Sequence, residues 1–411
     1  MRVLIACDSF KGSLSSAEAA EYISTGVRRV FPDAHIDVIP MADGGEGTAL
    51  ALTEALGGSL ERIQVRGPMG DPVEAVYGIL PGGEAVMDMA SASGLTLVPT
   101  GETDILSATT YGTGQLILAA LDKGCHRIYL GIGGSATNDG GLGLAQALGA
   151  RFPGGAEAEP LQGWSSCNQG DAVGEQPPPQ STFLAGKHLA DIAAIDLSRI
   201  DPRLASTEIS VLCDVTNPIC GPNGAAYIYG PQKGAGPVEM ALLDDGLAHL
   251  ADLVKRDLGL DLAETPGAGA AGGLGFGLMA FTGARLLRGV DFMLDAAGFD
   301  EKARRADLII TGEGRLDHQS AFGKAPAGVA HRGAALGTPV AAIGGAIDGG
   351  ALTMQALCEA GIGAIEACVC APMPLDEAME KAPVLLTDAS ERLMRGLSLG
   401  MLMGKPYRSD I

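Results

Sequence analysis

Apolar runs alternate with amphipathic segments at the start of the chain. Residues 2–7 form an apolar run that predicts a buried parallel strand, and residues 17–31 have the periodicity of a helix. Ser15 and Glu18 have the spacing of a capping box, which supports the start of that helix. A second strand over residues 36–41 and a second helix follow. This order is typical of an open α/β sheet.

The middle of the chain has a different pattern. Three short strands joined by turns that contain Pro and Gly predict antiparallel pairing, and they cover residues 60–66, 73–80 and 85–90. Strands and helices then alternate again: a helix over 109–123, a strand over 127–130, a helix over 142–148, a strand over 209–213 and a helix over 237–258. We therefore expect a domain boundary near residue 67.

The opening pattern returns after residue 290, with strands predicted at 306–311, 339–343 and 363–369 and helices at 326–336 and 376–402. We predict an α/β protein with two domains, one formed by residues 1–67 and 290–411 and the other by residues 68–289. Within the second domain, residues 151–190 are rich in Gly, Pro and Gln and lack apolar periodicity, which predicts a mobile surface loop.

Composition and charge narrow the classes of partner. A net charge of −21 argues against nucleic acid or an anionic membrane as a partner. Residues 266–284 carry no charge, but seven of them are Gly, so we interpret them as a loop and a buried helix rather than a membrane span. Eight cysteines without a Cys-x-x-Cys spacing favour a reducing cytoplasm over a disulfide framework.

Polar residues gather where predicted strands end, which is where open α/β sheets bind their ligands. The clusters are Asp8, Ser9 and Lys11; Asp43 and Glu46; Ser135, Asn138 and Asp139; Asp214 and Asn217; Lys233; and Glu313, Asp317 and Lys324. Any single cluster is better explained by caps and turns than by a site. Six clusters together favour a binding site.

The chemistry of these clusters is that of phosphoryl transfer. The loop 131–141 lies between a predicted strand and a helix, and its Gly133 and Gly134 offer backbone N–H groups to a phosphate. Carboxylates suit Mg²⁺, and lysines offset the charge of phosphate oxygens.

Two alternatives stay open at this point. Residues 131–136 and 267–272 match the dinucleotide-binding glycine pattern, which is the basis for a NAD(P)-dependent 2-hydroxy acid dehydrogenase. However, no strand with a terminal acidic residue follows the first match at the expected distance. The other alternative is a non-catalytic protein that binds a nucleotide or a metabolite.

The chain also resembles the bacterial glycerate kinase family, type I. The strings that carry the resemblance are DSFKGSLS (8–15), MADGGEGT (41–48), YGTGQLI (111–117), GIGGSATNDGGLG (131–143), CDVTNPICGPNGAAYIYGPQKGA (213–235), GAGAAGGLGFGL (267–278) and ADLIITGEGRLDHQSAFGKAP (306–326). Cys7 stands where the family usually has Pro, and the stretch 154–184 looks longer than usual.

The resemblance implies ATP-dependent phosphorylation of D-glycerate at the 2-hydroxyl, which gives 2-phospho-D-glycerate and ADP. It implies a Rossmann-like domain formed by both chain ends, with a second α/β domain inserted. The expected partners are D-glycerate and ATP, with neither nucleic acid nor a membrane, and a homo-oligomer stays open.

We assign roles by the chemistry of each group. Catalysis is assigned to Asp139, Asp8, Lys11 and Lys324, and substrate binding to Ser9, Arg315, Asn138, Ser135 and Asn217. ATP binding is assigned to Gly133, Gly134, Gly44, Gly45 and Lys233, and Mg²⁺ binding to Asp214, Asp43 and Glu313. The residues alone do not choose between the 2- and 3-hydroxyl, nor do they tell which domain holds ATP.

Overall fold

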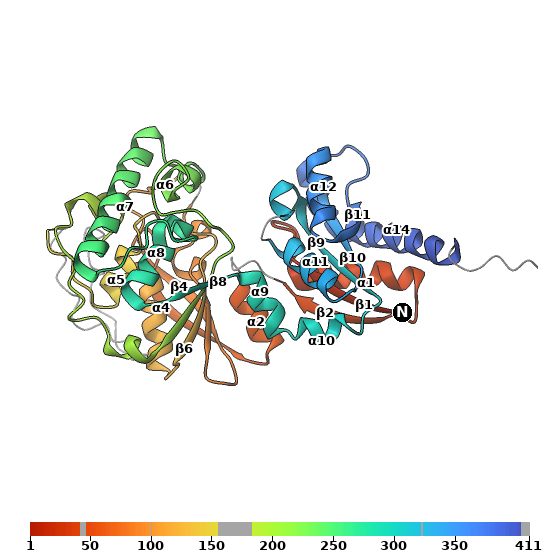
Figure 1. Ribbon diagram of the computed structural model, residues 1–411, viewed down its shortest axis with the longest axis horizontal. Helices are drawn as coiled ribbons and strands as arrows, with labels where there is room; N and C mark the ends of the chain where they lie inside the picture. Colours follow the sequence, from red (N-terminus) through yellow and green to blue (C-terminus); the bar gives the residue numbers. More distant parts are fainter. Residues whose placement is uncertain (42–46, 100, 155–182, 322–323, 404–411) are drawn as a thin grey trace, which may run out of the picture. The chain divides into compact units, whose positions relative to one another are not determined.

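Both ends of the chain contribute strands to one parallel sheet (Figure 1). The structure is a computed structural model that describes residues 1–41, 47–99, 101–154, 183–321 and 324–403. The chain divides into two compact units, residues 1–43 with 290–411 and residues 44–289. We call them the terminal unit and the central unit. The boundary expected near residue 67 lies inside the central unit, whose first helix begins at Thr48.

The terminal unit has a five-stranded sheet in the order β11-β10-β9-β1-β2, with every pair parallel. Its strands are β1 (Arg2–Cys7), β2 (His35–Pro40), β9 (Leu308–Leu316), β10 (Val340–Ile347) and β11 (Ile362–Ala367). Its helices are α1 (Ser16–Val30), α9 (Gly289–Ala296), α10 (Phe299–Ala303), α11 (Ala325–Ala335), α12 (Ala351–Glu359), α13 (Leu375–Glu380) and α14 (Ala382–Met403), with a 3₁₀ turn at His318–Ala321. This is the Rossmann-like arrangement that the resemblance implied.

Helices cover both faces of this sheet. Val3 and Ile5 of β1 pack into a buried cluster with α1 and α14, which approach each other closely at Gly26. On the other face, Gly333 of α11 lies against Ile309 of β9. The predicted capping box at the start of α1 is confirmed, since Ser15 Oγ accepts from Glu18 N and Ser15 N donates to the Glu18 carboxylate.

Strands β9 and β10 extend further than the sequence predicted. We expected β9 to end at Thr311 and β10 at Ile343, because glycines follow both positions. Instead the parallel register continues as far as Leu316 paired with Ile347. The glycines permit this close pairing, since a Cβ atom at Gly312 would lie 2.2 Å from the carbonyl oxygen of Ile343. Glu313 and Arg315 are therefore strand residues rather than loop residues.

The helix predicted over residues 376–402 is two helices, α13 and α14, which meet at Lys381. The physical reason is Pro383, whose ring lacks an N–H group and would clash with the carbonyl of residue 379 in a continuous helix. Pro is tolerated here because it lies in the first turn of α14.

The central unit has a six-stranded mixed sheet in the order β3-β4-β5-β6-β7-β8. Its strands are β3 (Ser59–Arg66), β4 (Pro72–Ile79), β5 (Ala85–Asp88), β6 (Arg127–Gly131), β7 (Glu208–Leu212) and β8 (Arg285–Leu287). The antiparallel pairing predicted for the first three strands is confirmed, and the remaining pairs are parallel. Its helices are α2 (Thr48–Ala55), α3 (Ala90–Ser93), α4 (Tyr111–Asp122), α5 (Leu142–Ala147), α6 (Ala225–Tyr229), α7 (Pro237–Leu258) and α8 (Ala270–Thr282), with 3₁₀ turns at Leu95–Leu97, Gly186–Asp191, Pro202–Ser206 and Pro231–Lys233.

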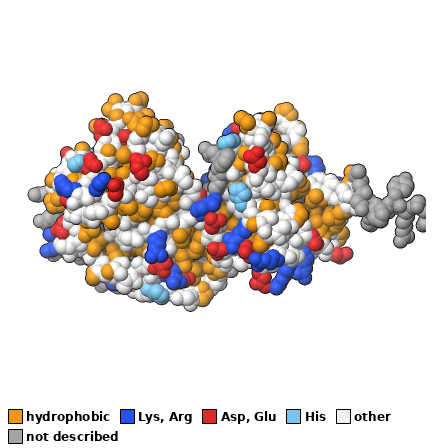
Figure 2. Space-filling view, viewed as in Figure 1, with side chains coloured by type: hydrophobic (Ala, Val, Ile, Leu, Met, Phe, Trp, Pro, Cys, Tyr) orange, Lys and Arg blue, Asp and Glu red, His pale blue; other side chains and the backbone are white. Residues whose placement is uncertain are grey.

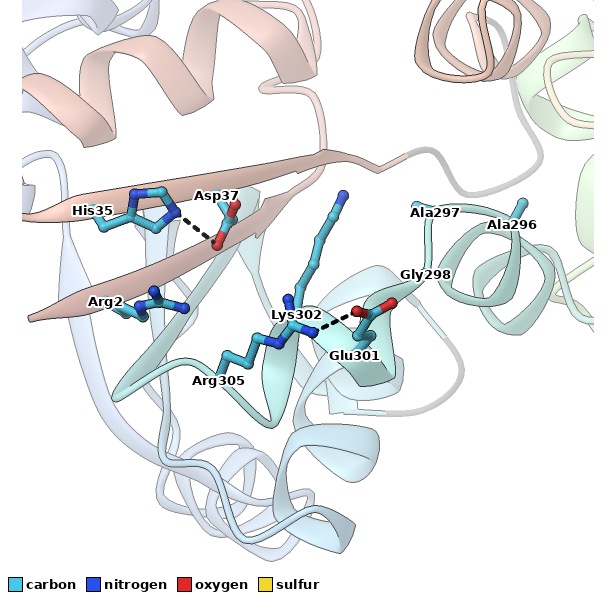
Figure 3. A pocket seen from close by; sticks show the side chains of 9 residues that line it. All are labelled: Arg2, His35, Asp37, Ala296, Ala297, Gly298, Glu301, Lys302 and Arg305. Atoms are coloured by element: carbon cyan, nitrogen blue, oxygen red, sulfur yellow. Dashed lines mark hydrogen bonds and ion pairs between the residues drawn. The ribbon is translucent and has the colours of Figure 1, made fainter.

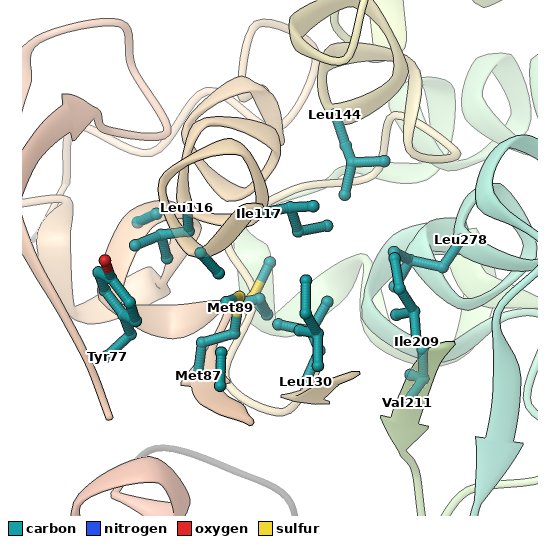
Figure 4. Packing of buried hydrophobic residues seen from close by; sticks show 14 of the residues in the cluster. Tyr77, Met87, Met89, Leu116, Ile117, Leu130, Leu144, Ile209, Val211 and Leu278 are labelled. Atoms are coloured by element: carbon teal, nitrogen blue, oxygen red, sulfur yellow. The ribbon is translucent and has the colours of Figure 1, made fainter. Parts of the chain in front are cut away.

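Helix α8 lies between two hydrophobic clusters of this unit. Leu274 and Leu278 pack with the sheet and α4, in the cluster shown in Figure 4, whereas Phe276 and Phe281 pack with α7. A helix that is apolar on all sides is buried inside a protein. This confirms the loop-plus-buried-helix interpretation of the uncharged stretch, and no helix of the described residues is long and apolar enough to cross a membrane.

The surface loop predicted at residues 151–190 is placed only in part, because residues 155–182 lie outside the described residues. At its carboxyl end the chain is already packed, since Phe183, Leu184 and Leu189 are buried and the turn Gly186–Asp191 lies against α7. These apolar residues follow directly on the Gly- and Pro-rich stretch, and this is why composition alone set the end of the loop too late.

Candidate active-site residues in the two units

Six predicted site residues meet in one pocket of the terminal unit. The cavity has a volume of about 350 Å³ and is lined by Asp8, Ser9, Lys11, Glu313, Arg315 and Lys324, together with Asp317 and further residues. It lies at the carboxyl ends of β1 and β9, which are neighbours in the sheet. We call it the terminal-unit pocket.

Local backbone bonds fix the acidic side of this pocket. Asp8 follows β1, is 6% exposed, and its N–H group donates to the carbonyl of Gly312 across the β1–β9 pair. The N–H of Ser9 donates to the Asp8 carboxylate at 2.6 Å. Asp8 is therefore held by the sheet and by its own turn.

The pocket is lined by equal numbers of acidic and basic side chains. Lys324 Nζ lies 3.9 Å from carboxylate oxygens of both Glu313 and Asp317, and Arg315 pairs with Asp348 at 3.0 Å. Lys324 is also the residue that precedes α11, where the helix amino end favours anions. Three basic and three acidic side chains thus surround a cavity that suits an anion accompanied by a cation.

One part of the pocket was not predicted. This part of the lining, which we call the apolar wall, is formed by Phe10, Val369, Leu375, Met379 and Leu385. Leu375 and Met379 have the i, i+4 spacing of one helix face, which is the sequence signal that could have found them. The prediction of one long helix over residues 376–402 conceals this face.

In the central unit, Asp139 is fully buried and its carboxylate accepts four hydrogen bonds. The donors are Thr110 N and Thr110 Oγ1 at 2.8 Å, Gly141 N at 3.0 Å and Gly143 N at 3.2 Å. Thr110 precedes α4 and Gly141 precedes α5, so the carboxylate joins the amino ends of two helices. Burial raises the pKa of Asp139, against the lowering effect of these hydrogen bonds.

Lys233 is a buried cation beside the same loop. It is 3% exposed, and its ammonium donates to Ser135 Oγ and to the carbonyl of Thr137, both at 2.7 Å. Burial lowers the pKa of Lys233 to about 7, while the nearby charge of Asp139 raises it. The structure thus brings together Ser135, Asp139 and Lys233, which the sequence named in two separate clusters.

Asn138 and Thr137 are buried in this loop without a hydrogen-bond partner for their side chains among the described residues. A left-handed turn packs on them, since Ala271 and Gly272 have positive φ and a Cβ at Gly272 would lie 2.0 Å from the carbonyl oxygen of Thr137. A buried polar group without a partner costs about 1–3 kcal/mol, so such groups often mark ligand or water sites. The sequence pattern indicated Asn138 as a site residue, but it indicated neither Thr137 nor the turn.

The remaining predicted residues have varied environments. Asn217 is tied locally, since its amide donates to the carbonyl of Asn223 and its oxygen accepts from Tyr229 Oη at 2.6 Å. Asp214 is half-buried after the end of β7, while Gly133 is half-buried and Gly134 exposed after β6. The predicted residues Asp43, Gly44 and Gly45 lie outside the described residues.

A wider depression of about 550 Å³ lies at the opposite, amino ends of β1 and β2 (Figure 3). Lys and Arg side chains gather around α10 on the face shown in Figure 2, with carboxylates among them. Both carboxylates that line the depression are paired, Asp37 with His35 at 3.5 Å and Glu301 with Arg305 at 2.7 Å. Because open α/β sheets bind ligands at the carboxyl ends of their strands, we assign no ligand here.

A parallel sheet with a charged pocket at its carboxyl edge is typical of α/β proteins that bind a small polar ligand. The model of the glycerate kinase family matches residues 3–398. The chain therefore belongs to the glycerate kinase family.

Individual relatives cover nearly the whole chain. A glycerate kinase of Halalkalibacterium halodurans is 45% identical over 392 residues, which are 95% of this chain and 97% of the relative. The glycerate 2-kinase of Escherichia coli is 42% identical over 405 residues, which are 98% of this chain and 99% of the relative. A crystal structure of a Salmonella typhimurium LT2 protein assigned as glycerate kinase 2 has a TM-score of 0.78 and 40% identity, and the match covers 98% of this chain and 99% of that one. These comparisons give no support to the dehydrogenase or to the non-catalytic binding protein.

The lowered pKa of Lys233 predicts a pH-dependent contribution to stability. Between the usual value of 10.5 and about 7, the folded protein has released a proton that the unfolded chain still holds. The contribution of Lys233 to stability therefore rises as the pH increases from about 7 towards 10.5, and it is lowest below about 7, where the folded and the unfolded chain both hold the proton. We expect the melting temperature of the wild type to rise relative to Lys233→Met between about pH 6 and pH 9, as measured by thermal unfolding.

The matched control is Lys255→Met, because Lys255 is exposed and its ion pair with Asp261 raises its pKa, so it stays charged in both states over this range. Its difference from the wild type should stay constant over the same pH range. A pH-independent difference for Lys233→Met would contradict the assignment of a lowered pKa.

Proposed function

We propose that this protein transfers the γ-phosphoryl group of ATP to the 2-hydroxyl of D-glycerate, which gives 2-phospho-D-glycerate and ADP. The observation that carries the proposal is the 42% identity to a glycerate 2-kinase over 98% of this chain. Membership of the family implies ATP as the phosphate donor. The seven described cysteines are free thiols, which supports our proposal of a reducing cytoplasm.

The two units are proposed to be the two domains, the terminal one built from both chain ends. Each offers groups that suit the reaction. In the terminal-unit pocket, Lys11, Arg315 and Lys324 supply positive charge for carboxylate or phosphate oxygens, and Asp8 and Ser9 supply hydrogen-bonding groups. In the central unit, Ser135, Asn138 and Lys233 supply buried donors. Phosphate contacts by Gly133, Gly134 and Lys233, and a substrate contact by Asn217, stay predictions.

The attacking hydroxyl needs a base or an orienting acceptor. Asp8 is our candidate, because its carboxylate lines the terminal-unit pocket. We propose Asp139 as a positioning residue rather than the base, because its oxygens are already occupied by donors from Thr110, Gly141 and Gly143. Through these bonds it holds the loop that carries Asn138 and Ser135.

We further propose that Mg²⁺ accompanies ATP. Among the described residues there is no group of three or more His, Cys, Asp or Glu side chains that could hold a metal ion. Mg²⁺ does not require one, because it binds through one or two carboxylates together with waters and substrate phosphates. Glu313 and Asp214 are the described candidates, and the bound ion would neutralise phosphate charge.

The activity is tested by incubating the purified protein with ATP, Mg²⁺ and D-glycerate. We expect ADP release, measured with a coupled enzyme assay, and a ³¹P NMR doublet from phosphate bound to the carbon-2 oxygen. A triplet from a phosphate on the carbon-3 oxygen would contradict the regiochemistry. Reduction of NAD(P)⁺ by D-glycerate without ADP release would contradict the kinase.

Chelation tests the proposed metal. We expect EDTA to abolish ADP release and added Mg²⁺ to restore it, because the phosphate charge would otherwise be unscreened. Glu313→Gln should raise the Mg²⁺ concentration required for half-maximal rate. Unchanged activity in excess EDTA would overturn the proposal.

Asp139→Asn tests the positioning role. An amide replaces one acceptor oxygen with an NH₂ donor that faces other donors, so we expect a lower melting temperature together with a kcat reduced by about 100-fold. Asp245→Asn on the exposed face of α7 is the control and should leave both quantities unchanged. A merely structural role would lower the melting temperature alone, and normal turnover in the folded variant would refute the assignment.

A further inference from the structure

The lining of the terminal-unit pocket combines two kinds of group. Its charged groups come from the β1 end, β9 and Lys324. Its apolar groups are Phe10 from the loop after β1, Val369 after β11, and Leu375, Ala378 and Met379 from α13. A ligand that fits such a pocket has an anionic end and an apolar end.

Glycerate does not have this character. Each of its three carbon atoms bears oxygen, so it offers no apolar face to the wall built by α13 and Phe10. Burying the charged acid against that wall would remove its water without replacing the lost hydrogen bonds. A purine base has two apolar ring faces and is linked through a ribose to phosphates, so it matches both kinds of group.

The position in the fold favours the same ligand. The chain leaves β1 towards β2 on one side, whereas β9 pairs with β1 on its other side. The carboxyl ends of β1 and β9 are thus the point where the strand order reverses, and open α/β sheets bind nucleotides there. A cavity of about 350 Å³ is also much larger than a three-carbon acid requires and falls in the range of small-molecule sites.

We propose that the terminal-unit pocket binds the purine nucleoside part of ATP, with the base on the wall formed by Phe10 and α13. The phosphates point towards Lys11, Arg315 and Lys324. This inference rests on the proposed kinase activity for the choice of ATP, and it concerns the nucleoside part alone.

Helix α13 is the element that completes this wall. Leu375, Ala378 and Met379 lie on one face of it, and α13 ends at Glu380, before α14 begins at Ala382. Met379 closes onto the loop after β1, where a Cβ at Gly12 would lie 2.6 Å from its terminal methyl group. Leu375 remains 73% exposed at the mouth of the pocket, and a bound base would cover it.

The test is a substitution that blocks the part of the pocket where the base would bind. Ala378→Phe places a ring where the base would lie, and Val384→Phe places the same ring on α14 at a 61% exposed position outside the pocket lining. We expect Ala378→Phe to raise the Kd for ATP, measured by titration calorimetry without glycerate, and the KM for ATP by about tenfold or more. Its KM for D-glycerate should change by less than about twofold, and Val384→Phe should match the wild type.

Each other result has a defined meaning. A raised KM for D-glycerate with unchanged ATP binding would show that the pocket holds the acid, and unchanged constants for both would show that it holds neither. If Ala378→Phe does not fold, Leu375→Asp decides, because this side chain is exposed and its replacement should weaken ATP binding without unfolding the protein. If the wild type binds ATP in this pocket but releases no ADP with D-glycerate, the proposed function fails and the pocket assignment stands.

Discussion

The pairing of β1 with β9 is the interaction on which the terminal unit depends. Val3 to Ile5 pair in parallel with Leu308 to Ile310, although some three hundred residues separate them. Parallel strands require a long connection, and here that connection includes α1, β2 and the whole central unit. The hydrogen bond from Asp8 N to the carbonyl of Gly312 extends this pairing to the carboxyl edge of the sheet. The acidic and basic groups of the pocket therefore meet because two distant strands share one register.

In the central unit, the polar groups are held in place by a buried loop and the turn that packs on it. Residues 135–141 of its loop 131–141 are buried, and the left-handed turn of α8, where Ala271 has φ of 54°, packs on them. Backbone strain of this kind persists where the surroundings enforce it, and here Gly140 N donates to the carbonyl of Gly272 at 3.1 Å. The turn holds the Thr137–Asn138 backbone in place. The side chains of Thr137, Asn138 and Lys233 are thus kept in a dry environment, where electrostatic effects are strong.

Glycine and proline explain where sequence and structure differ. At Gly312 and Gly344 the sequence suggested strand ends, but these residues allow β9 and β10 to pair more closely and to continue. At Pro383 the sequence contained the helix break, although the apolar periodicity on both sides concealed it. Both residue types act through steric contact with a neighbouring residue. The neighbours of Gly312 and Gly344 lie in another strand, so a local sequence pattern does not show them. The clash caused by Pro383 would lie within one helix, so the sequence does show it.

The sequence by itself determined the fold class, the antiparallel start of the mixed sheet, the strand-end clusters and the family. Local periodicity, turn chemistry and long specific strings are sufficient for these, because each depends on residues close together in the chain. Tertiary structure decided which clusters meet. It placed Asp8 beside Glu313, and Lys233 beside Ser135, and it gave the first group an apolar wall from α13. It also showed Asp139 as a buried acceptor of four hydrogen bonds. Burial and long-range pairing are properties of the packed chain, so no local pattern of residues contains them.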